Sequence, residues 1–159
     1  MNTRHVNLAT AFSAVSLLLV DSVAAQSSAY RAQELAPAPR APRVHITRGP
    51  ELESADDSSA IIRWQSNNPG GSDEHYGVVH YGTSPKELNQ TAKSHIRLNQ
   101  THSYTVFRVR VEGLAPRTTY YYTVDSIRAS GESDGVKSPV AKFTTPGPGE
   151  RIMNFPQPK

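Results

Sequence analysis

The sequence contains no cysteine. Neither a disulfide framework nor a thiolate metal site can therefore hold the chain together, and its stability must come from burial and hydrogen bonding. The 159 residues leave room for one domain of ordinary size with tails at both ends. A single core built from roughly 100 residues is large enough to fold without covalent or metal support.

Blocks of like charge are also absent. The formal net charge is +3 and the sequence pI is about 9.3, but basic and acidic residues are mixed along the chain. No stripe of aromatic and basic residues and no known nucleic-acid motif accompanies this small positive excess. The composition therefore predicts a solvated, mildly basic surface and no nucleic-acid partner.

Motifs that carry catalysis are missing as well. The one Gly-x-Ser-x-Gly pattern, at residues 131–135, lies in a polar hairpin loop and not at a strand-to-helix elbow, so no nucleophile is predicted there. Gly70 and Gly71 lie in turn chemistry with no helix after them, so no phosphate-binding loop is predicted. His75 and His80 are separated by an odd number of residues, which sends their imidazoles to opposite faces of a strand. We interpret both as surface or edge histidines. The sequence thus predicts no catalytic residue, no cofactor and no metal site.

After residue 25 no apolar run is long enough to cross a bilayer. Residues 1–25 have the pattern of a signal peptide, with Arg4 in a basic n-region, an apolar run from Val6 to Val20 and a small-residue cleavage site at Val23-Ala24-Ala25. A membrane anchor is the alternative, but the run is interrupted by serine and threonine and is shorter than a span. We expect a secreted protein, periplasmic or extracellular, with no membrane span after cleavage.

The composition marks the boundaries of the single domain. Residues 26–41 are rich in alanine and proline, which favours an extended linker because few large apolar groups are available for burial. The domain is predicted at 42–146. Residues 147–159 show no periodic pattern and are expected to form a flexible C-terminal tail.

What the domain does contain is strand periodicity, because apolar residues alternate with polar ones without any helical repeat. Turn residues separate the alternating segments, and the acidic segment 51–57 and the polar segment 129–135 are interpreted as loops. Seven strands at this spacing predict an all-β, two-layer antiparallel sandwich. The predicted strands are 44–47, 59–65, 76–82, a short edge strand followed by a loop within 88–96, 104–111, 120–125 and 141–145.

The most informative stretch is the corner between the two strands around residues 113–124. Pro116 fixes its own φ and cannot donate to a ladder, so the chain must turn there. A tyrosine at the start of the next strand, Tyr120, can bury its ring while its hydroxyl bonds to backbone a few residues upstream, as in the tyrosine corner. The residues assigned to the structural core are Trp64, Tyr81, Leu114, Pro116, Tyr120, Tyr122 and Phe143.

The run of Leu114, Pro116, Thr118 and Tyr120 resembles the corner of fibronectin type III domains, which are seven-stranded immunoglobulin-like sandwiches. Trp64 takes the place of the tryptophan in the core of such domains. Over about 42–146, the segments Val-His-Ile-Thr, Val-x-Tyr-Gly-Thr and Phe-x-Thr-Pro narrow this resemblance to the fibronectin-like N-terminal domain of purple acid phosphatases.

This resemblance implies an accessory domain without its own chemistry. Purple acid phosphatases hold two metal ions in a separate and larger metallophosphatase domain. The Gly-Asp, Gly-Asn-His and Gly-His-x-His metal motifs of that domain do not occur in this sequence. We therefore expect a non-catalytic chain.

Two surface features are candidates for interaction or modification. Tyr121, Val78 and His80 are predicted to share the outer face of one sheet, where they either contact a protein partner or form ordinary cross-strand pairs. Asn89 and Asn99 each begin a glycosylation sequon in a predicted loop or edge.

Three functional hypotheses remain open at this point. The first is a secreted interaction or spacer module of the fibronectin type III kind, with an unidentified protein partner. The second is an accessory domain of a purple acid phosphatase system that docks on a separate catalytic subunit. The third is attachment to carbohydrate or a cell surface. The sequence does not define the oligomeric state.

Overall fold

The alternating segments of the sequence form strands that pair only in antiparallel fashion. A computed structural model describes residues 41, 43–68, 73–99 and 101–154. The predicted signal peptide and all but the last residue of the predicted linker lie outside the described residues. Within those ranges no helix is found that could serve as a membrane span. The same ranges hold nine strands, which are β1 (Ile46–Asp56), β2 (Ser59–Asn67), β3 (Glu74–Gly82), β4 (Gln90–Arg97), β5 (Tyr104–Glu112), β6 (Thr119–Arg128), β7 (Ser133–Lys137), β8 (Ala141–Thr144) and β9 (Arg151–Met153).

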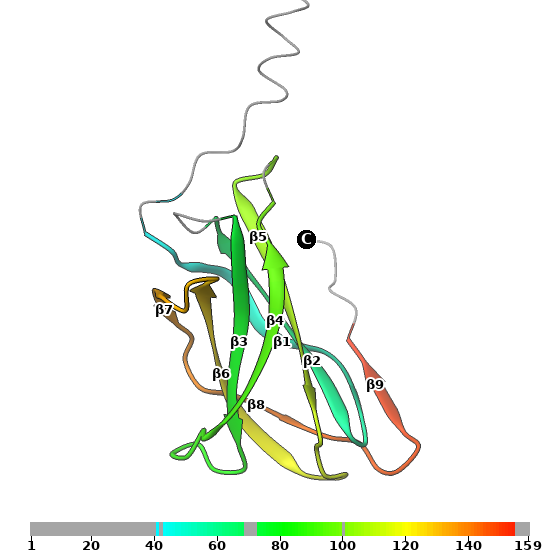
Figure 1. The fold of residues 1–159 in the computed structure, drawn as a ribbon. Coiled ribbons are helices and arrows are strands. Elements are labelled where there is room, and N and C mark those ends of the chain that lie inside the picture. Colours follow the sequence, from blue (N-terminus) through cyan, green and yellow to red (C-terminus); the bar gives the residue numbers. More distant parts are fainter. Residues whose placement is uncertain (1–40, 42, 69–72, 100, 155–159) are drawn as a thin grey trace, which may run out of the picture. The chain divides into compact units, whose positions relative to one another are not determined.

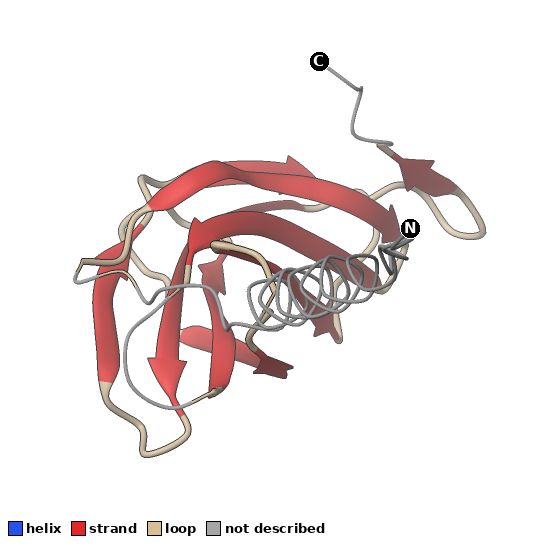
Figure 2. Ribbon diagram, turned by 90° about the horizontal axis from the view of Figure 1, so that it is seen from above, coloured by secondary structure: helices blue, strands red, loops and turns tan. Residues whose placement is uncertain are grey.

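Two sheets lie face to face (Figures 1 and 2). One sheet has the strand order β5-β2-β1-β9, and the other has the order β4-β3-β6-β7 with β8 also paired to β6. This arrangement confirms the predicted fold class, an immunoglobulin-like antiparallel sandwich. The strand count differs from the predicted seven because the sequence pattern does not reveal β7 and β9.

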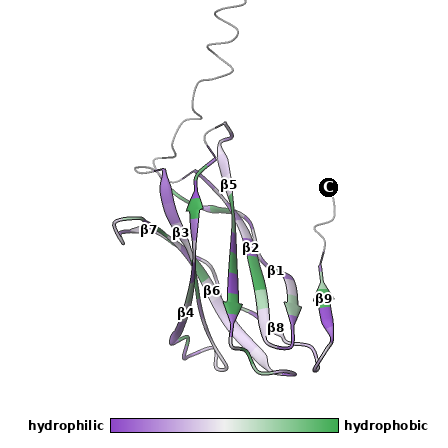
Figure 3. Cartoon of the chain, turned by 45° about the vertical axis from the view of Figure 1, so that its right-hand side comes forward, coloured by the Kyte–Doolittle hydropathy of each residue, from purple (hydrophilic) through white to green (hydrophobic). Residues whose placement is uncertain are grey.

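The core fills the space between the sheets, and along β5 hydrophobic and hydrophilic residues alternate (Figure 3). Trp64 is only 1% exposed and stacks on Phe107, with ring centroids 5.1 Å apart and an interplanar angle of 6°. β3 can approach the indole this closely only because residue 77 is glycine. A Cβ at that position would lie 3.0 Å from the indole ring. The buried apolar residues of the core are Ala55, Ala60, Ile62, Trp64, Val79, Tyr81, Leu98, Phe107, Val109, Val111, Leu114, Tyr120, Tyr122, Val124 and Phe143.

The tyrosine corner is present at the start of β6. Tyr120 is 6% exposed, and its hydroxyl accepts a hydrogen bond of 3.0 Å from the backbone N–H of Ala115. Thr145 ties the same corner to the end of β8 because its hydroxyl donates to the carbonyl of Ala115 at 2.6 Å. Pro116, which the sequence assigns to the core, is exposed. It acts on backbone direction at the turn, a role that does not require burial.

The acidic segment after residue 50 is a strand, and its interpretation as a loop is wrong. β1 runs through it to Asp56 because Glu51 and Glu53 project outward, with Arg63 and Arg108 as partners. The closest oxygen of Glu51 lies 2.8 Å from Arg63 and that of Glu53 lies 2.7 Å from Arg108. Cross-strand ion pairs offset the low strand propensity of glutamate.

The segment after Pro146 also differs from the expected tail as far as residue 154. β9 pairs with the Ser54–Asp56 portion of β1 and forms the edge of its sheet. Asn154 continues this pairing, with its backbone N–H donating to the carbonyl of Glu53 at 2.8 Å and its side-chain amide donating to Leu52. A three-residue strand is too short to show a sequence period, so the register with β1 is what defines it.

Candidate functional site

A buried polar cluster joins three strands on one side of the molecule. His75 of β3 is fully buried, and its Nδ1 lies 2.8 Å from Oδ2 of Asp134 on β7. The same carboxylate oxygen accepts a hydrogen bond of 2.8 Å from the hydroxyl of Ser126 on β6. The side chain of Asp134 is 1% exposed, so the three groups meet inside the protein rather than on its surface.

The cluster has the residue types of a hydrolase triad but not its geometry. In a triad the serine hydroxyl bonds to the imidazole, which takes its proton, whereas here Ser126 donates to the carboxylate. Ser126 is 1% exposed and His75 is fully buried, so no substrate could reach either group. The arrangement holds β7 against β3 and β6 and does not constitute a catalytic site.

The sequence predicts His75 at the surface or at an edge, and the structure instead buries it. The reason is β7, a strand that begins inside the segment interpreted as a polar loop and brings Asp134 over the imidazole. The two histidines nevertheless lie on opposite faces of β3, as their odd spacing predicts. His80 is on the outer face and is half-buried. Among the described residues, no three histidine, aspartate or glutamate side chains are grouped as a metal site would require.

The predicted partner surface is less accessible than expected. Val78 is 2% exposed, so it offers no contact area to another protein. It lies on the central strand of its sheet, between Lys93 of β4 and Asp125 of β6, whose longer side chains flank it. His80 and Tyr121 are half-buried. The three residues therefore do not form a continuous exposed patch, and of the two alternatives left open by the sequence the burial of Val78 favours ordinary cross-strand pairing.

The surroundings of His80 on the outer face of this sheet change its pKa. Burial lowers the pKa of His80 from its ordinary value, and the positive charges of Lys137 and Lys93 act in the same direction. Asp125 opposes them. At neutral pH this sheet face therefore presents a neutral imidazole between two lysines.

The two sequons differ in their local structure. Asn89 is exposed just before β4. The side-chain oxygen of Asn99 accepts hydrogen bonds from the backbone N–H of Thr101 at 3.1 Å and from its hydroxyl at 2.9 Å. Glycosylation at either asparagine remains a prediction.

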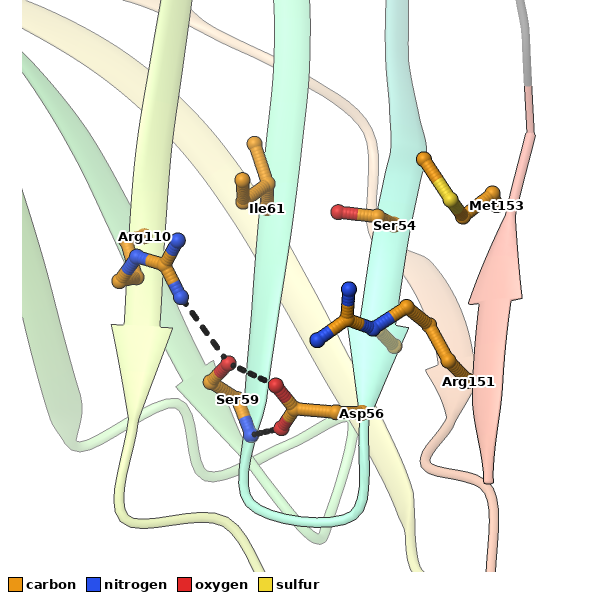
Figure 4. Close-up of a pocket in the computed structure, with 8 residues that line it drawn as sticks. Ser54, Asp56, Ser59, Ile61, Arg110, Arg151 and Met153 are labelled. Carbon is orange, nitrogen blue, oxygen red and sulfur yellow. Dashed lines mark hydrogen bonds between the residues drawn. The ribbon is translucent and has the colours of Figure 1, made fainter. Parts of the chain in front are cut away.

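The other sheet has a hollow on its outer face that sequence reasoning missed. A pocket of about 200 Å³ opens over β5, β2, β1 and β9 (Figure 4). Arg110, Ile61, Ser54 and Met153 form one row across these four strands, since each residue is the register partner of the next. The small side chain of Ser54 leaves the space between its larger neighbours.

Asp56 borders this pocket, and its carboxylate is hydrogen-bonded to the turn between β1 and β2. One carboxylate oxygen accepts the backbone N–H groups of Ser58 at 2.9 Å and Ser59 at 2.6 Å, and the other accepts the hydroxyl of Ser59. The backbone bond from Ser58 and the side-chain bond from Ser59 lower the pKa of Asp56 to about 2. The hydroxyl of Ser59 also accepts a bond of 3.2 Å from Arg110 (Figure 4).

Because the pKa of Asp56 is lowered in the folded protein, its contribution to stability should depend on pH. Because the carboxyl group takes up its proton more readily in the unfolded chain, its contribution to stability is complete above pH 4 and is lost as the pH falls from about 4 to about 2. We expect an Asp56→Asn variant to be less stable than the wild type at pH 7 and nearly equal to it at pH 2. Urea unfolding at both pH values measures this, and a stability difference independent of pH would contradict it.

The fold defines the class of protein. The strand order, the stacked Trp64 and the tyrosine corner are those of a fibronectin type III-like sandwich, with β9 as an added edge strand. The family model described as "Purple acid Phosphatase, N-terminal domain" matches residues 42–145. The chain belongs to this family of N-terminal domains.

Solved structures resemble the chain only distantly. A sensor domain of the anti-sigma factor RsgI4 from Pseudobacteroides cellulosolvens is 20% identical, with a TM-score of 0.47 over 65% of this chain and 95% of that chain. The fn3 domain of human contactin 1 is 14% identical, with a TM-score of 0.43 over 72% of this chain and 87% of that chain. Comparison with curated proteins gives no match.

Proposed function

We propose that this chain is a secreted, non-catalytic interaction module whose partner is a metallophosphatase catalytic domain. The observation that carries the proposal is the family match over residues 42–145, which spans the sandwich from before β1 to the end of β8. The metal chemistry of purple acid phosphatases belongs to a separate domain, so what this family membership supports is a docking role and not the reaction itself.

Features of the chain agree with a module that works by contact. The buried cluster of His75, Ser126 and Asp134 is closed to solvent and has the wrong hydrogen-bond order for catalysis. The signal-peptide pattern of residues 1–25 supports secretion. The absence of cysteine is no obstacle to secretion, because the core is large enough to fold without a disulfide.

The catalytic half of the proposal is tested on the purified mature chain. We expect no stoichiometric metal by elemental analysis and no hydrolysis of a chromogenic phosphate ester above the buffer rate, with and without added iron, zinc or manganese. A turnover that follows metal content would show that the chain is an enzyme.

The partner half is tested by capture. The mature chain, immobilised through a C-terminal tag, is exposed to the secreted fraction of its source, and bound proteins are identified by mass spectrometry. We expect a protein that carries the Gly-Asp, Gly-Asn-His and Gly-His-x-His motifs. Capture with the Trp64→Ala variant, whose core is disrupted, controls for adhesion to the support. Repeated failure to enrich such a protein would leave a spacer module as the better description.

A further inference from the structure

We propose that the pocket between Arg110 and Arg151 is a docking surface that takes an acidic side chain from a partner protein. The identity of that partner rests on the proposed function. What is added here is the sheet face that the partner contacts and the chemical group that it supplies. The surface is defined by Ser54, Ile61, Arg110, Arg151 and Met153, on the outer face of the β5-β2-β1-β9 sheet (Figure 4).

Register brings these residues together from distant parts of the chain. Arg110 lies opposite Ile61, Ile61 lies opposite Ser54, and Ser54 lies opposite Met153. Arg151 follows in the next row, opposite Asp56. In Figure 4 the guanidinium groups of Arg110 and Arg151 extend toward the space above the β1–β2 hairpin from its two sides. The two cations thus border one hollow.

The two arginines that border the pocket are not ion-paired, unlike Arg63 and Arg108 on the same sheet face. Arg63 and Arg108 are held by Glu51 and Glu53. Within the described ranges, neither Arg110 nor Arg151 has a carboxylate oxygen within the 4.0 Å of an ion pair. Asp56 also lines the pocket, and its carboxylate is hydrogen-bonded to the hairpin backbone and to Ser59. Two guanidinium groups and one carboxylate therefore border the pocket, and their excess of positive charge complements a carboxylate from a partner.

The apolar wall of the pocket favours a protein partner over a free anion. Met153 is 56% exposed and Ile61 is half-buried, so an occupant meets hydrocarbon beside the two guanidinium groups. Arginine and methionine are enriched at protein interfaces, where partner residues exclude water from the ion pair. A free anion would leave Met153 exposed and would compete with water for two solvated cations, an arrangement that contributes little to binding.

The test uses a synthetic peptide of alternating leucine and glutamate and the isotope-labelled mature chain. We expect peptide addition to shift the NMR signals of Arg110, Arg151 and the backbone of β1 and β9. The Arg110→Gln/Arg151→Gln variant should bind at least tenfold more weakly, because both charge-assisted hydrogen-bond donors are lost. A Ser54→Leu variant, which fills the hollow and keeps both charges, should also weaken binding at least fivefold.

The control removes the same charge elsewhere. An Arg48→Gln/Arg97→Gln variant loses two exposed arginines from β1 and β4 and should bind within twofold of the wild type. A peptide with glutamine in place of glutamate should not bind. The proposal is overturned by equal weakening in both double variants, by shifts confined to other strands, or by inorganic phosphate or acetate reproducing the shifts at the same concentration as the peptide.

The capture experiment, repeated with the Arg110→Gln/Arg151→Gln variant, distinguishes failure of this inference from failure of the proposed function. If wild type and the Arg110→Gln/Arg151→Gln variant retain a metallophosphatase equally, the proposed function holds and the assigned surface is wrong. If the peptide binds as expected and no metallophosphatase is captured, the surface stands and the named partner is wrong.

Discussion

A Trp64→Ala substitution is expected to lower the free energy of unfolding by about 3 to 5 kcal/mol. The indole is 1% exposed and stacks on Phe107 with ring centroids 5.1 Å apart, so its removal loses buried area and leaves a cavity between the sheets. Gly77 on β3 faces the same ring, and a strand backbone cannot collapse far enough to fill the space. Urea unfolding followed by far-UV circular dichroism measures the loss, because the variant has no tryptophan fluorescence.

Tyr104 provides a control for this experiment. It is an aromatic residue of β5 that is 39% exposed, and Tyr104→Ala should cost less than about 1 kcal/mol. In the wild type, Trp64 fluorescence should resist quenching by acrylamide until the protein unfolds. Equal losses for the two substitutions, or ready quenching of the native protein, would show that the indole is not in the core.

Asp134→Ala is expected to cost about 3 to 5 kcal/mol, a loss comparable with that of the tryptophan substitution. The substitution leaves Nδ1 of His75 and the hydroxyl of Ser126 buried without the carboxylate that both contact at 2.8 Å. Desolvation of each group then goes uncompensated, and β7 loses its side-chain contacts with β3 and β6 while its backbone pairing with β6 remains. Urea unfolding at pH 7 gives the loss, and hydrogen exchange should show faster opening of β7.

Ser126→Ala separates the role of the carboxylate from that of the hydroxyl. It removes the hydrogen bond from Ser126 to Asp134 and keeps the contact to His75, so we expect a loss of about 1 kcal/mol. If Asp134→Ala costs no more than Ser126→Ala, the cluster does not hold β7 in place.

Most of the sandwich was predictable because its strands carry a strict period of two. Phe107, Val109 and Val111 are buried as the alternation requires, while Tyr120 makes the corner bond that its position indicated. This information is local to each segment. The acidic part of β1 could not be recognised in the same way, because its glutamates are stabilised by arginines on strands that follow later in the chain.

The residues of the candidate sites were harder to predict because they depend on register between distant strands. Arg110 alternates with apolar residues and so belongs to the wetted face of its strand, but nothing in the sequence relates it to Arg151, which lies in a segment without periodicity. His75 resembles an edge histidine in the sequence because Asp134 lies 59 residues away in a polar stretch. Val78 alternates like a surface residue, yet its neighbours on both adjacent strands bury it.

The position of β9 has a consequence for self-association. Its three residues cover backbone groups of β1 over Ser54–Asp56 that would otherwise be free to recruit a strand from another molecule. Detachment of so short a strand would turn this border of the sheet into a template for edge-to-edge aggregation. Under the proposed docking, a partner that engages Arg151 would also hold the strand in place, so that recognition and resistance to aggregation would depend on the same few residues.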